Sequence, residues 1–382
     1  MKLARTLMPI ALCAVAASAW AAPPTQYQVT NLTSDLSGAT PNVDPILQNA
    51  WGIAFTTGGS PFWIADNATG CSTLYDGAGV PQPTTTPKPL RVKIPLPGGS
   101  IPSTACMHAT SSTSPTPAAP TGLVFNSTPA FLVPKQSTNI PALFIFDTED
   151  GTISAWAGGL NPSDQAVLAV DESADKAVFK ALAFGTNSHG TFLFATNFRL
   201  ATVEAFAPNG STGYRRATSS EVEGDFTDSN IPPGYAPFGI HTIGGVLFVT
   251  YALQNAEKHD DVAGQGHGFV DIFGTDGHLI QRFAQHGQLN SPWGVVRASM
   301  SFGDFSGLIL VGNFGDGTIN AYDNNGRFVG TVRGLNNKPV VINGLWSLTL
   351  GGALNSNPAT LYFTAGPNGE TDGLFGTVTP IP

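Results

Sequence analysis

Residues 293–322 read WGVVRASMSFGDFSGLILVGNFGDGTINAY. This stretch holds a short apolar segment that begins with Trp293-Gly294, an apolar run over 308–313, and a third segment over 317–322 that ends in Tyr322. Short apolar or alternating segments separated by Gly, Asn and Asp are typical of β-strands joined by tight turns. The stretch therefore predicts three consecutive strands of one antiparallel sheet.

The same pattern occurs six times along the chain. We align the copies on Gly52, Gly122, Ala181, Gly239, Gly294 and Trp346, which are 70, 59, 58, 55 and 52 residues apart. A repeat of about 40–50 residues with loop insertions is typical of a propeller blade. Turn sequences such as Asp276-Gly277 and Asn325-Gly326 follow the third segment and predict a fourth, outer strand. We therefore predict an all-β fold, a six-bladed β-propeller. Two packed β-sandwiches are the alternative, but they would not explain six copies of one pattern.

The two ends of the chain complement each other in this repeat. The sixth copy ends soon after Val378 and has no outer strand of its own. Residues 27–32 alternate between polar and apolar side chains and belong to no other copy. We predict that this N-terminal strand pairs with the last blade and closes the ring, because closure leaves no open sheet edge.

The first residues and the cysteines indicate export. Residues 1–21 have a basic start, an apolar segment over 7–17 and a small-x-small cleavage pattern, as signal peptides do. We expect residues 22–382 to form a single propeller domain in the periplasm or outside the cell. Cys71 and Cys106 stay in the mature chain, and an oxidising compartment favours a disulfide between them. No later segment reaches the ~18 apolar residues of a membrane span.

Parts of the chain resemble known propellers. The copy at 291–313 resembles the NHL type of repeat, and most of the mature chain resembles a family of exported bacterial NHL-like six-bladed propellers of unassigned function. The resemblance is carried by the strings at 49–52, 65–67, 146–151, 196–198, 259–264, 289–294, 312–317 and 344–346. This resemblance implies the propeller fold. It implies no activity, because the family has no assigned function.

Polar side chains gather on one face of the predicted propeller, where blade-to-blade loops and second-to-third-strand loops emerge. The acidic and amide residues of this set come from loops of all six blades: Asp66, Asn67, Glu149, Asp150, Asn197, Asp260, Asp261, Asn313, Asp316, Asn368, Glu370 and Asp372, with Asn49, Asn290 and Asn343 just before inner strands. The candidate metal ligands among them are six asparagines: Asn49, Asn67, Asn197, Asn290, Asn313 and Asn343. Their oxygens could converge on Ca²⁺, which prefers oxygen ligands. Alternatively, each asparagine caps its own loop through bonds to the backbone.

The long loop over 254–268 lies on the same predicted face. It contains His259, Asp260 and Asp261, which are the candidate acid–base residues of the chain. Long loops in compact domains are often functional, and the alternative is a solvated loop without a role. Trp51, Trp293 and Trp346 begin inner strands, where packing between blades explains them.

Three kinds of function fit this sequence. The first is a binding module that offers its loop face to a protein or glycan. The alternative is a hydrolase of lactones or esters, similar to gluconolactonases, in which Ca²⁺ polarises a carbonyl and His259, Asp260 or Asp261 activates water. Ca²⁺ is the one cofactor implied, and only by this alternative. The third is a structural envelope or matrix protein. The net charge of −9 without a basic run argues against nucleic acid as a partner, and we expect a monomer.

Overall fold

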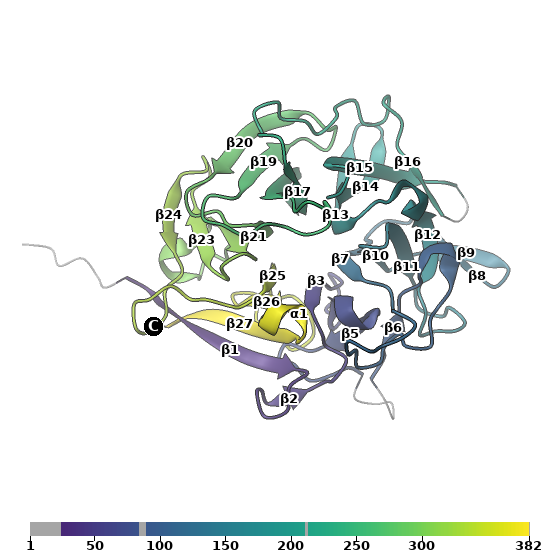
Figure 1. Cartoon of the computed structure of the whole chain (residues 1–382), viewed down its shortest axis with the longest axis horizontal. Coiled ribbons are helices and arrows are strands. Elements are labelled where there is room, and N and C mark those ends of the chain that lie inside the picture. The colour runs from purple at the N-terminus through teal and green to yellow at the C-terminus, as the bar shows by residue number, and fades with distance from the viewer. Residues whose placement is uncertain (1–23, 84–88, 211–212, 382) are drawn as a thin grey trace, which may run out of the picture.

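The computed structural model describes residues 24–83, 89–210 and 213–381. Six sheets surround a central axis, and each sheet runs from an inner strand at the axis to an outer strand at the rim (Figure 1). The predicted all-β, six-bladed propeller is therefore confirmed. The predicted signal peptide lies outside the described residues.

The first three blades follow one another along the chain. Blade one contains β3 (Ala50–Ala54), β4 (Phe62–Asp66), β5 (Cys71–Tyr75) and β6 (Val92–Lys93). Blade two contains β7 (Pro120–Phe125), β10 (Phe144–Thr148), β11 (Thr152–Trp156) and β12 (Val167–Asp171), with the inserted hairpin β8 (Leu132–Lys135) and β9 (Thr138–Pro141). Blade three contains β13 (Phe179–Asn187), β14 (Gly190–Asn197), β15 (Thr202–Pro208) and β16 (Tyr214–Arg216).

The second half repeats this arrangement. Blade four contains β17 (Tyr235–Ile243), β18 (Val246–Leu253), β19 (Phe269–Phe273) and β20 (Leu279–Gln285). Blade five contains β21 (Pro292–Arg297), β22 (Ile309–Asn313), β23 (Ile319–Tyr322) and β24 (Phe328–Thr331). Blade six contains β25 (Leu345–Leu350), β26 (Leu361–Ala365) and β27 (Leu374–Ile381), with the short helix α1 (Pro367–Glu370) between the last two. Four 3-10 turns lie in the described loops: Asn67–Thr69, Pro97–Gly99, Ser173–Asp175 and Gly303–Phe305.

The N-terminal strand completes the last blade. β1 (Gln26–Ser34) pairs antiparallel with β27 from Gln26 opposite Ile381 to Ser34 opposite Leu374. Figure 1 shows the two strands side by side, β1 in purple and β27 in yellow. A short strand, β2 (Asn42–Val43), adds to β1 in parallel. Blade six thus takes its outer strand from the start of the described chain.

Each inner strand carries a β-bulge at the same level of the axis. In blade one Ala50 pairs with Asp66 and Ile53 with Ile64, so one residue of β3 is extra. The other five inner strands have an equivalent shift in register. In blade six the pairs are Leu345 with Ala365 and Leu348 with Phe363. Ser347, and not Trp346 as the sequence alignment had it, is therefore the counterpart of Gly52.

The glycines at the bulges let the inner strands approach one another. A Cβ atom on Gly52 would lie 2.5 Å from the carbonyl oxygen of Thr121 in blade two. A Cβ atom on Gly239 would lie 2.2 Å from the carbonyl oxygen of Trp293 in blade five. Real Cβ atoms do not come so close to backbone, so these positions need glycine for the strands to pack around a narrow axis.

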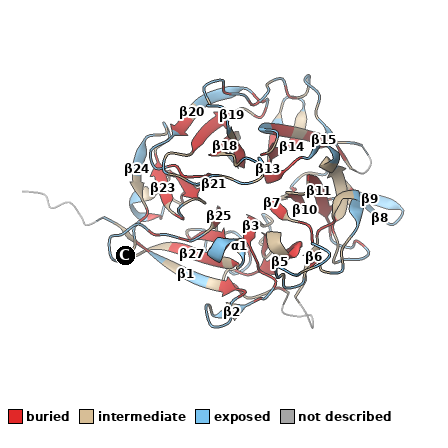
Figure 2. Ribbon diagram, viewed as in Figure 1, coloured by how far each residue is buried: buried red, intermediate tan, exposed pale blue. Residues whose placement is uncertain are grey.

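The core lies between neighbouring blades. All residues of the middle strands β4 and β5 are buried, as are those of β10 and β11, and Figure 2 shows exposed segments mainly at the rim. Aromatic rings join adjacent sheets, as where Trp63 of blade one stacks on Phe144 of blade two with ring centres 4.2 Å apart.

The predicted disulfide is confirmed. Cys71 at the start of β5 is bonded to Cys106 in the loop that leads to blade two. Among the described residues, no helix has the length and apolar character needed to cross a bilayer.

Candidate loop-face site

A layer of six side chains closes the channel. One comes from the bulge of each inner strand, and we call them the tryptophan layer: Trp51, Thr121, Lys180, Phe238, Trp293 and Trp346. Each of the six is at most 2% exposed. The rings of Trp51 and Trp346 stack with centres 3.5 Å apart, and Trp293 meets both edge-on at 6.1–6.2 Å. The tryptophans thus pack against one another across the axis, beyond the contacts between neighbouring blades that we expected.

Lys180 is the charged member of this layer. Its ammonium nitrogen lies 5.2 Å from the ring centre of Trp51 and 5.7 Å from that of Phe198. On the loop face it forms an ion pair with Glu149 and lies 3.6 Å from Asp260 Oδ1. A buried ammonium is costly without partners, so aromatic faces and carboxylates together hold this charge.

The second carboxylate oxygen of Glu149 begins a hydrogen-bonded chain across three blades. Asn67 donates to Glu149 Oε2 at 2.9 Å and accepts from Asn49 at 3.2 Å. Asn49 also donates to Glu370 Oε2 at 2.8 Å. The indole N–H of Trp346 donates to Asn49 Oδ1 at 2.9 Å, which ties the network to the tryptophan layer.

The loop over 254–268 brings His259 and Asp260 to this network. The loop is folded on itself, because the Asn255 side chain accepts from the His259 backbone N–H at 3.0 Å and the Asn255 backbone N–H donates to the Asp260 carbonyl at 2.8 Å. Asn290 of the neighbouring blade accepts from Gly264 N–H at 2.7 Å. Internal and blade-to-blade bonds therefore hold both candidate residues above Lys180.

His259 and Asp260 form a polarised pair. His259 Nδ1 lies 2.8 Å from Asp260 Oδ1 and 3.9 Å from Glu149 Oε1. The bond to Asp260 raises the pKa of His259 above its ordinary value, with the Glu149 charge adding to the effect. The same bond lowers the pKa of Asp260, with help from Lys180. The pair favours an ionised Asp260 and a His259 that gains a proton easily.

Glu370 differs from the other carboxylates. Burial raises its pKa to about 7, and the nearby charges of Glu149 and Asp260 act in the same direction. It is therefore partly protonated near neutral pH. Lys180 pairs with Glu149 and His259 pairs with Asp260, so these charged groups already have partners within the network.

The structure brings together some of the predicted site residues and not others. Asn49 and Asn67 meet at the network, as do His259 and Asp260. Asp261 is half-buried nearby, and burial raises its pKa. Four asparagines instead bond to groups outside this network, so the six side chains do not share one set of partners. Asn197 binds Glu204 at 2.8 Å, Asn290 binds Gly264, Asn313 binds the Gln288 carbonyl at 2.7 Å, and Asn343 accepts from Asn368 N–H at 2.9 Å.

One cluster has the composition of a metal site. Single ligand atoms of Glu149, His259 and Asp260 lie within 4.8 Å of one another. However, the ammonium of Lys180 already contacts Glu149 and lies near Asp260. This ammonium would repel a second cation at the same carboxylates, and imidazole is a poor ligand for Ca²⁺. These residues therefore do not fit Ca²⁺ as the side chains are arranged.

Sequence reasoning missed Lys180. Its signal lies in the register of the inner strands, because Lys180 occupies the position that holds Trp51, Phe238, Trp293 and Trp346 in other blades. A charged residue in a buried layer, at a position that is aromatic in most other blades, indicates that a partner of opposite charge lies nearby. The alignment on Gly52, Ala181, Gly239 and Gly294 already placed Lys180 opposite Trp51, Phe238 and Trp293, so this signal was present in the sequence.

A cavity of about 410 Å³ lies beside Glu370 on the loop face. Its walls include the hydroxyl and amide side chains of Gln48, Thr110, Ser111 and Thr371. Gln48 is itself fixed, since it accepts from Ala109 N–H at 2.7 Å and donates to the Thr371 carbonyl at 3.1 Å. Glu370 thus faces both the central network and a polar cavity.

The relatives found by sequence comparison are viral. The chain is 29% identical over 357 residues to uncharacterized protein R648 of Acanthamoeba polyphaga mimivirus, covering 93% of this chain and 80% of that protein. It is 27% identical over 354 residues to uncharacterized protein L690 of the same virus, covering 92% and 85%. No protein-family model matches the chain.

Solved structures support the fold. A protein of unknown function from Bacteroides thetaiotaomicron overlays with a TM-score of 0.52 at 10% identity, covering 94% of this chain and 76% of that one. A gluconolactonase from Xanthomonas campestris overlays with a TM-score of 0.48 at 12% identity, covering 94% and 96%, which is too distant to bear on chemistry. The chain is therefore similar to six-bladed propellers, while its resemblance to an exported bacterial NHL-like family stays a prediction.

Proposed function

We propose that the chain is an exported binding module whose loop face holds a hydroxyl-rich ligand, a glycan, at the mouth of the closed channel. One observation carries the proposal: side chains from five blades meet in one network of hydrogen bonds and ion pairs on top of the tryptophan layer. A preformed polar network above a closed channel can hold a ligand without reorganising, which favours affinity. The disulfide and the predicted signal peptide support the export part of the proposal.

The charge of the network favours a neutral ligand. Lys180 pairs with Glu149, His259 pairs with Asp260, and Glu370 has a pKa of about 7. A strongly charged partner would gain little from such a site, whereas sugar hydroxyls can donate to carboxylates and accept from hydroxyl and amide groups. The adjacent cavity, with its hydroxyl and amide walls, gives such a ligand room beside Glu370.

The alternative is the hydrolase of lactones or esters that uses Ca²⁺. The cluster of Glu149, His259 and Asp260 is the observation in its favour. Lys180 weakens it, because its ammonium already pairs with Glu149 and lies 3.6 Å from Asp260, the two carboxylates that would hold the ion. The binding module asks for no rearrangement of these side chains, and we therefore rank it first.

A glycan array probed with the purified mature protein tests the binding module, followed by titration of the retained glycan. Glu370→Ala removes the carboxyl that joins network and cavity, and we expect affinity to fall about tenfold or more. Glu257→Ala is the matched control, because Glu257 is exposed in the loop over 254–268. Thermal unfolding checks that both variants fold. An array that retains no glycan, or a Glu370→Ala variant that binds like the wild type, would contradict the proposal.

A further inference from the structure

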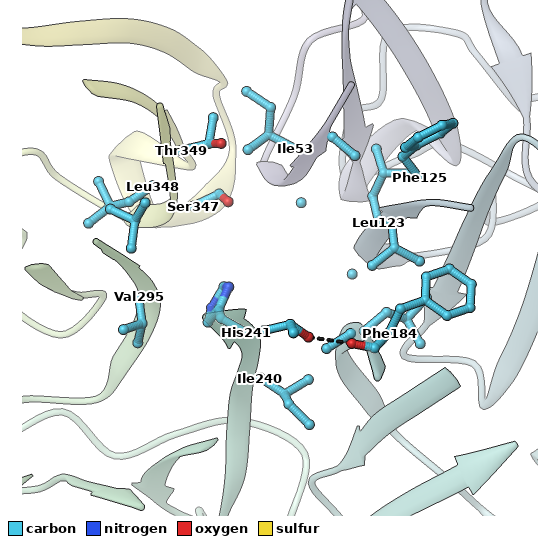
Figure 3. A pocket seen from close by; sticks show the side chains of 18 of the residues that line it. Ile53, Leu123, Phe125, Phe184, Ile240, His241, Val295, Ser347, Leu348 and Thr349 are labelled. Atoms are coloured by element: carbon cyan, nitrogen blue, oxygen red, sulfur yellow. Dashed lines mark hydrogen bonds between the residues drawn. The ribbon is translucent and has the colours of Figure 1, made fainter. Parts of the chain in front are cut away.

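The channel has a second cavity on the other side of the tryptophan layer. It measures about 450 Å³ and is lined by the inner strands of all six blades (Figure 3). Since the six side chains of the layer are almost fully buried, this cavity has no passage to the loop face. It is a blind pocket that opens on the opposite face, and we call it the far pocket.

Apolar and polar groups contribute nearly equal surface to the far pocket. Its apolar part is formed largely by six side chains from five inner strands: Ile53, Leu123, Phe125, Phe184, Ile240 and Leu348. Such a surface gains free energy when an apolar molecule replaces water, and pockets of this size and character are typical of small-molecule sites.

One strong hydrogen-bond acceptor interrupts the apolar wall. His241 Nε2 lies 2.9 Å from the Trp293 carbonyl, and its ring meets Trp293 edge-on. A carbonyl can only accept, so Nε2 carries the proton of this bond. Burial lowers the pKa of His241 to about 4, which keeps the ring neutral and leaves Nδ1 as an acceptor. Within the described part of the chain, Nδ1 has no hydrogen-bond partner.

Hydroxyl groups add to the polar surface of the far pocket. The Thr242 hydroxyl is engaged with the Phe184 carbonyl, as the dashed line in Figure 3 shows. Ser347 and Thr349 of blade six contribute hydroxyl groups to the same cavity (Figure 3). The Thr349 hydroxyl donates to the Leu350 carbonyl at 3.4 Å. The pocket thus offers an apolar part, one imidazole acceptor and the hydroxyl of Ser347.

We propose that the far pocket binds a small, mainly apolar molecule that carries one hydroxyl group, such as a substituted phenol, with that hydroxyl donating to His241 Nδ1. The tryptophan layer separates this site from the loop face. The proposal is therefore independent of glycan binding on the loop face, and it would still hold if no glycan binds there.

The test uses 4-propylphenol as probe and 4-propylanisole as its matched analogue without a donor. Isothermal titration of the mature protein measures stoichiometry and affinity. We expect one phenol per chain, with the anisole bound up to about tenfold more weakly, which is the range of one net hydrogen bond. The His241→Phe variant should bind both molecules equally.

A second variant keeps the test decisive if the His241 change disturbs folding. Thr349→Trp places a large side chain in the far pocket from the half-buried position of Thr349, and it should abolish binding of the phenol. Thr138→Trp is the control, because Thr138 is exposed on the β8–β9 hairpin away from the channel. The proposal is overturned if the wild type shows no saturable binding, if Thr349→Trp binds like Thr138→Trp, or if phenol and anisole bind the wild type equally.

Discussion

The ammonium of Lys180 lies 5.2 Å from the ring centre of Trp51, which places a buried cation of blade three against the tryptophan stack of the channel. Its carboxylate partners come from loops of blades two and four. This arrangement gives the loop face its own fixed positive charge. Lys180 therefore links the closed channel below to the polar network above.

Replacing Lys180 should destabilise the fold through its partners. Lys180→Met keeps the packing on Trp51 and Phe198 but leaves Glu149 without its counter-charge, and removing one partner of a buried pair costs about 3–5 kcal/mol. Adding Glu149→Gln should recover part of this loss. Urea unfolding measures the free energy of all variants, with the exposed Lys338→Met as control, which should change it by less than about 0.5 kcal/mol. Equal stability of Lys180→Met and the wild type would show that the ion pair is not structural.

Asp147 should make the stability depend on pH. Its Oδ1 accepts hydrogen bonds from Thr121 Oγ1 at 2.8 Å and from Gly122 N–H at 2.5 Å, while burial raises its pKa from 3.8 to about 7. Because the folded state then binds the proton more tightly than the unfolded state, the free energy of unfolding falls as pH rises from about 4 to about 7.

Asp147→Asn removes this contribution. The fall in unfolding free energy between about pH 4 and about pH 7 should be smaller in the variant than in the wild type, although Glu370, with its pKa raised to about 7, keeps part of it. Urea unfolding at both pH values measures the difference. An unchanged pH profile would mean that Asp147 is ionised in the folded protein.

The disulfide should contribute measurable stability. Cys71 and Cys106 close a loop with a sequence separation of 35 residues, and such bonds typically contribute about 2–4 kcal/mol. The double variant Cys71→Ser/Cys106→Ser should lose about this amount. A reductant should lower the unfolding midpoint of the wild type and leave that of the double variant unchanged. If the wild type ignores the reductant while its thiols become free, the disulfide is not a stabilising element.

Gly52 should tolerate no side chain. In Gly52→Ala the new Cβ would meet the Thr121 carbonyl at 2.5 Å, and overpacking of this kind costs about 1–3 kcal/mol. Gly58→Ala is the matched control, since the nearest atom to its Cβ would be 3.8 Å away. Thermal unfolding of both variants compares the positions. Equal midpoints would show that the inner strands can separate at no cost.

Much of the fold follows from local sequence. Segments such as 308–313 and 317–322 show their strand character through short apolar runs and turn residues. The strand at 27–32 belongs to no other blade, and blade six lacks an outer strand, so the pairing of the two could be predicted. The alignment was off by one residue in blade six because Ser347, and not glycine, stands at the bulge of its inner strand.

The site was less predictable for a physical reason. Whether Asn197 or Asn313 turns toward the axis or toward its own loop depends on neighbouring backbone groups that only the folded chain brings close. Lys180 gained its role from Glu149 and Asp260, which are 31 and 80 positions away in sequence. The residue types predicted a polar loop face. Which of its side chains bond to one another depends on the folded arrangement of the loops.

Thermal unfolding of the chelator-treated mature protein, with and without Ca²⁺, tests most directly whether Lys180 supplies the positive charge of the loop face. We expect no shift of the wild-type midpoint. Lys180→Ala, which frees the carboxylates of Glu149 and Asp260, should become more stable when Ca²⁺ is added, because an ion that binds only the folded state stabilises it. A Ca²⁺-dependent rise in the wild-type midpoint, with near-stoichiometric metal in the untreated protein, would contradict this arrangement and favour the Ca²⁺-dependent hydrolase.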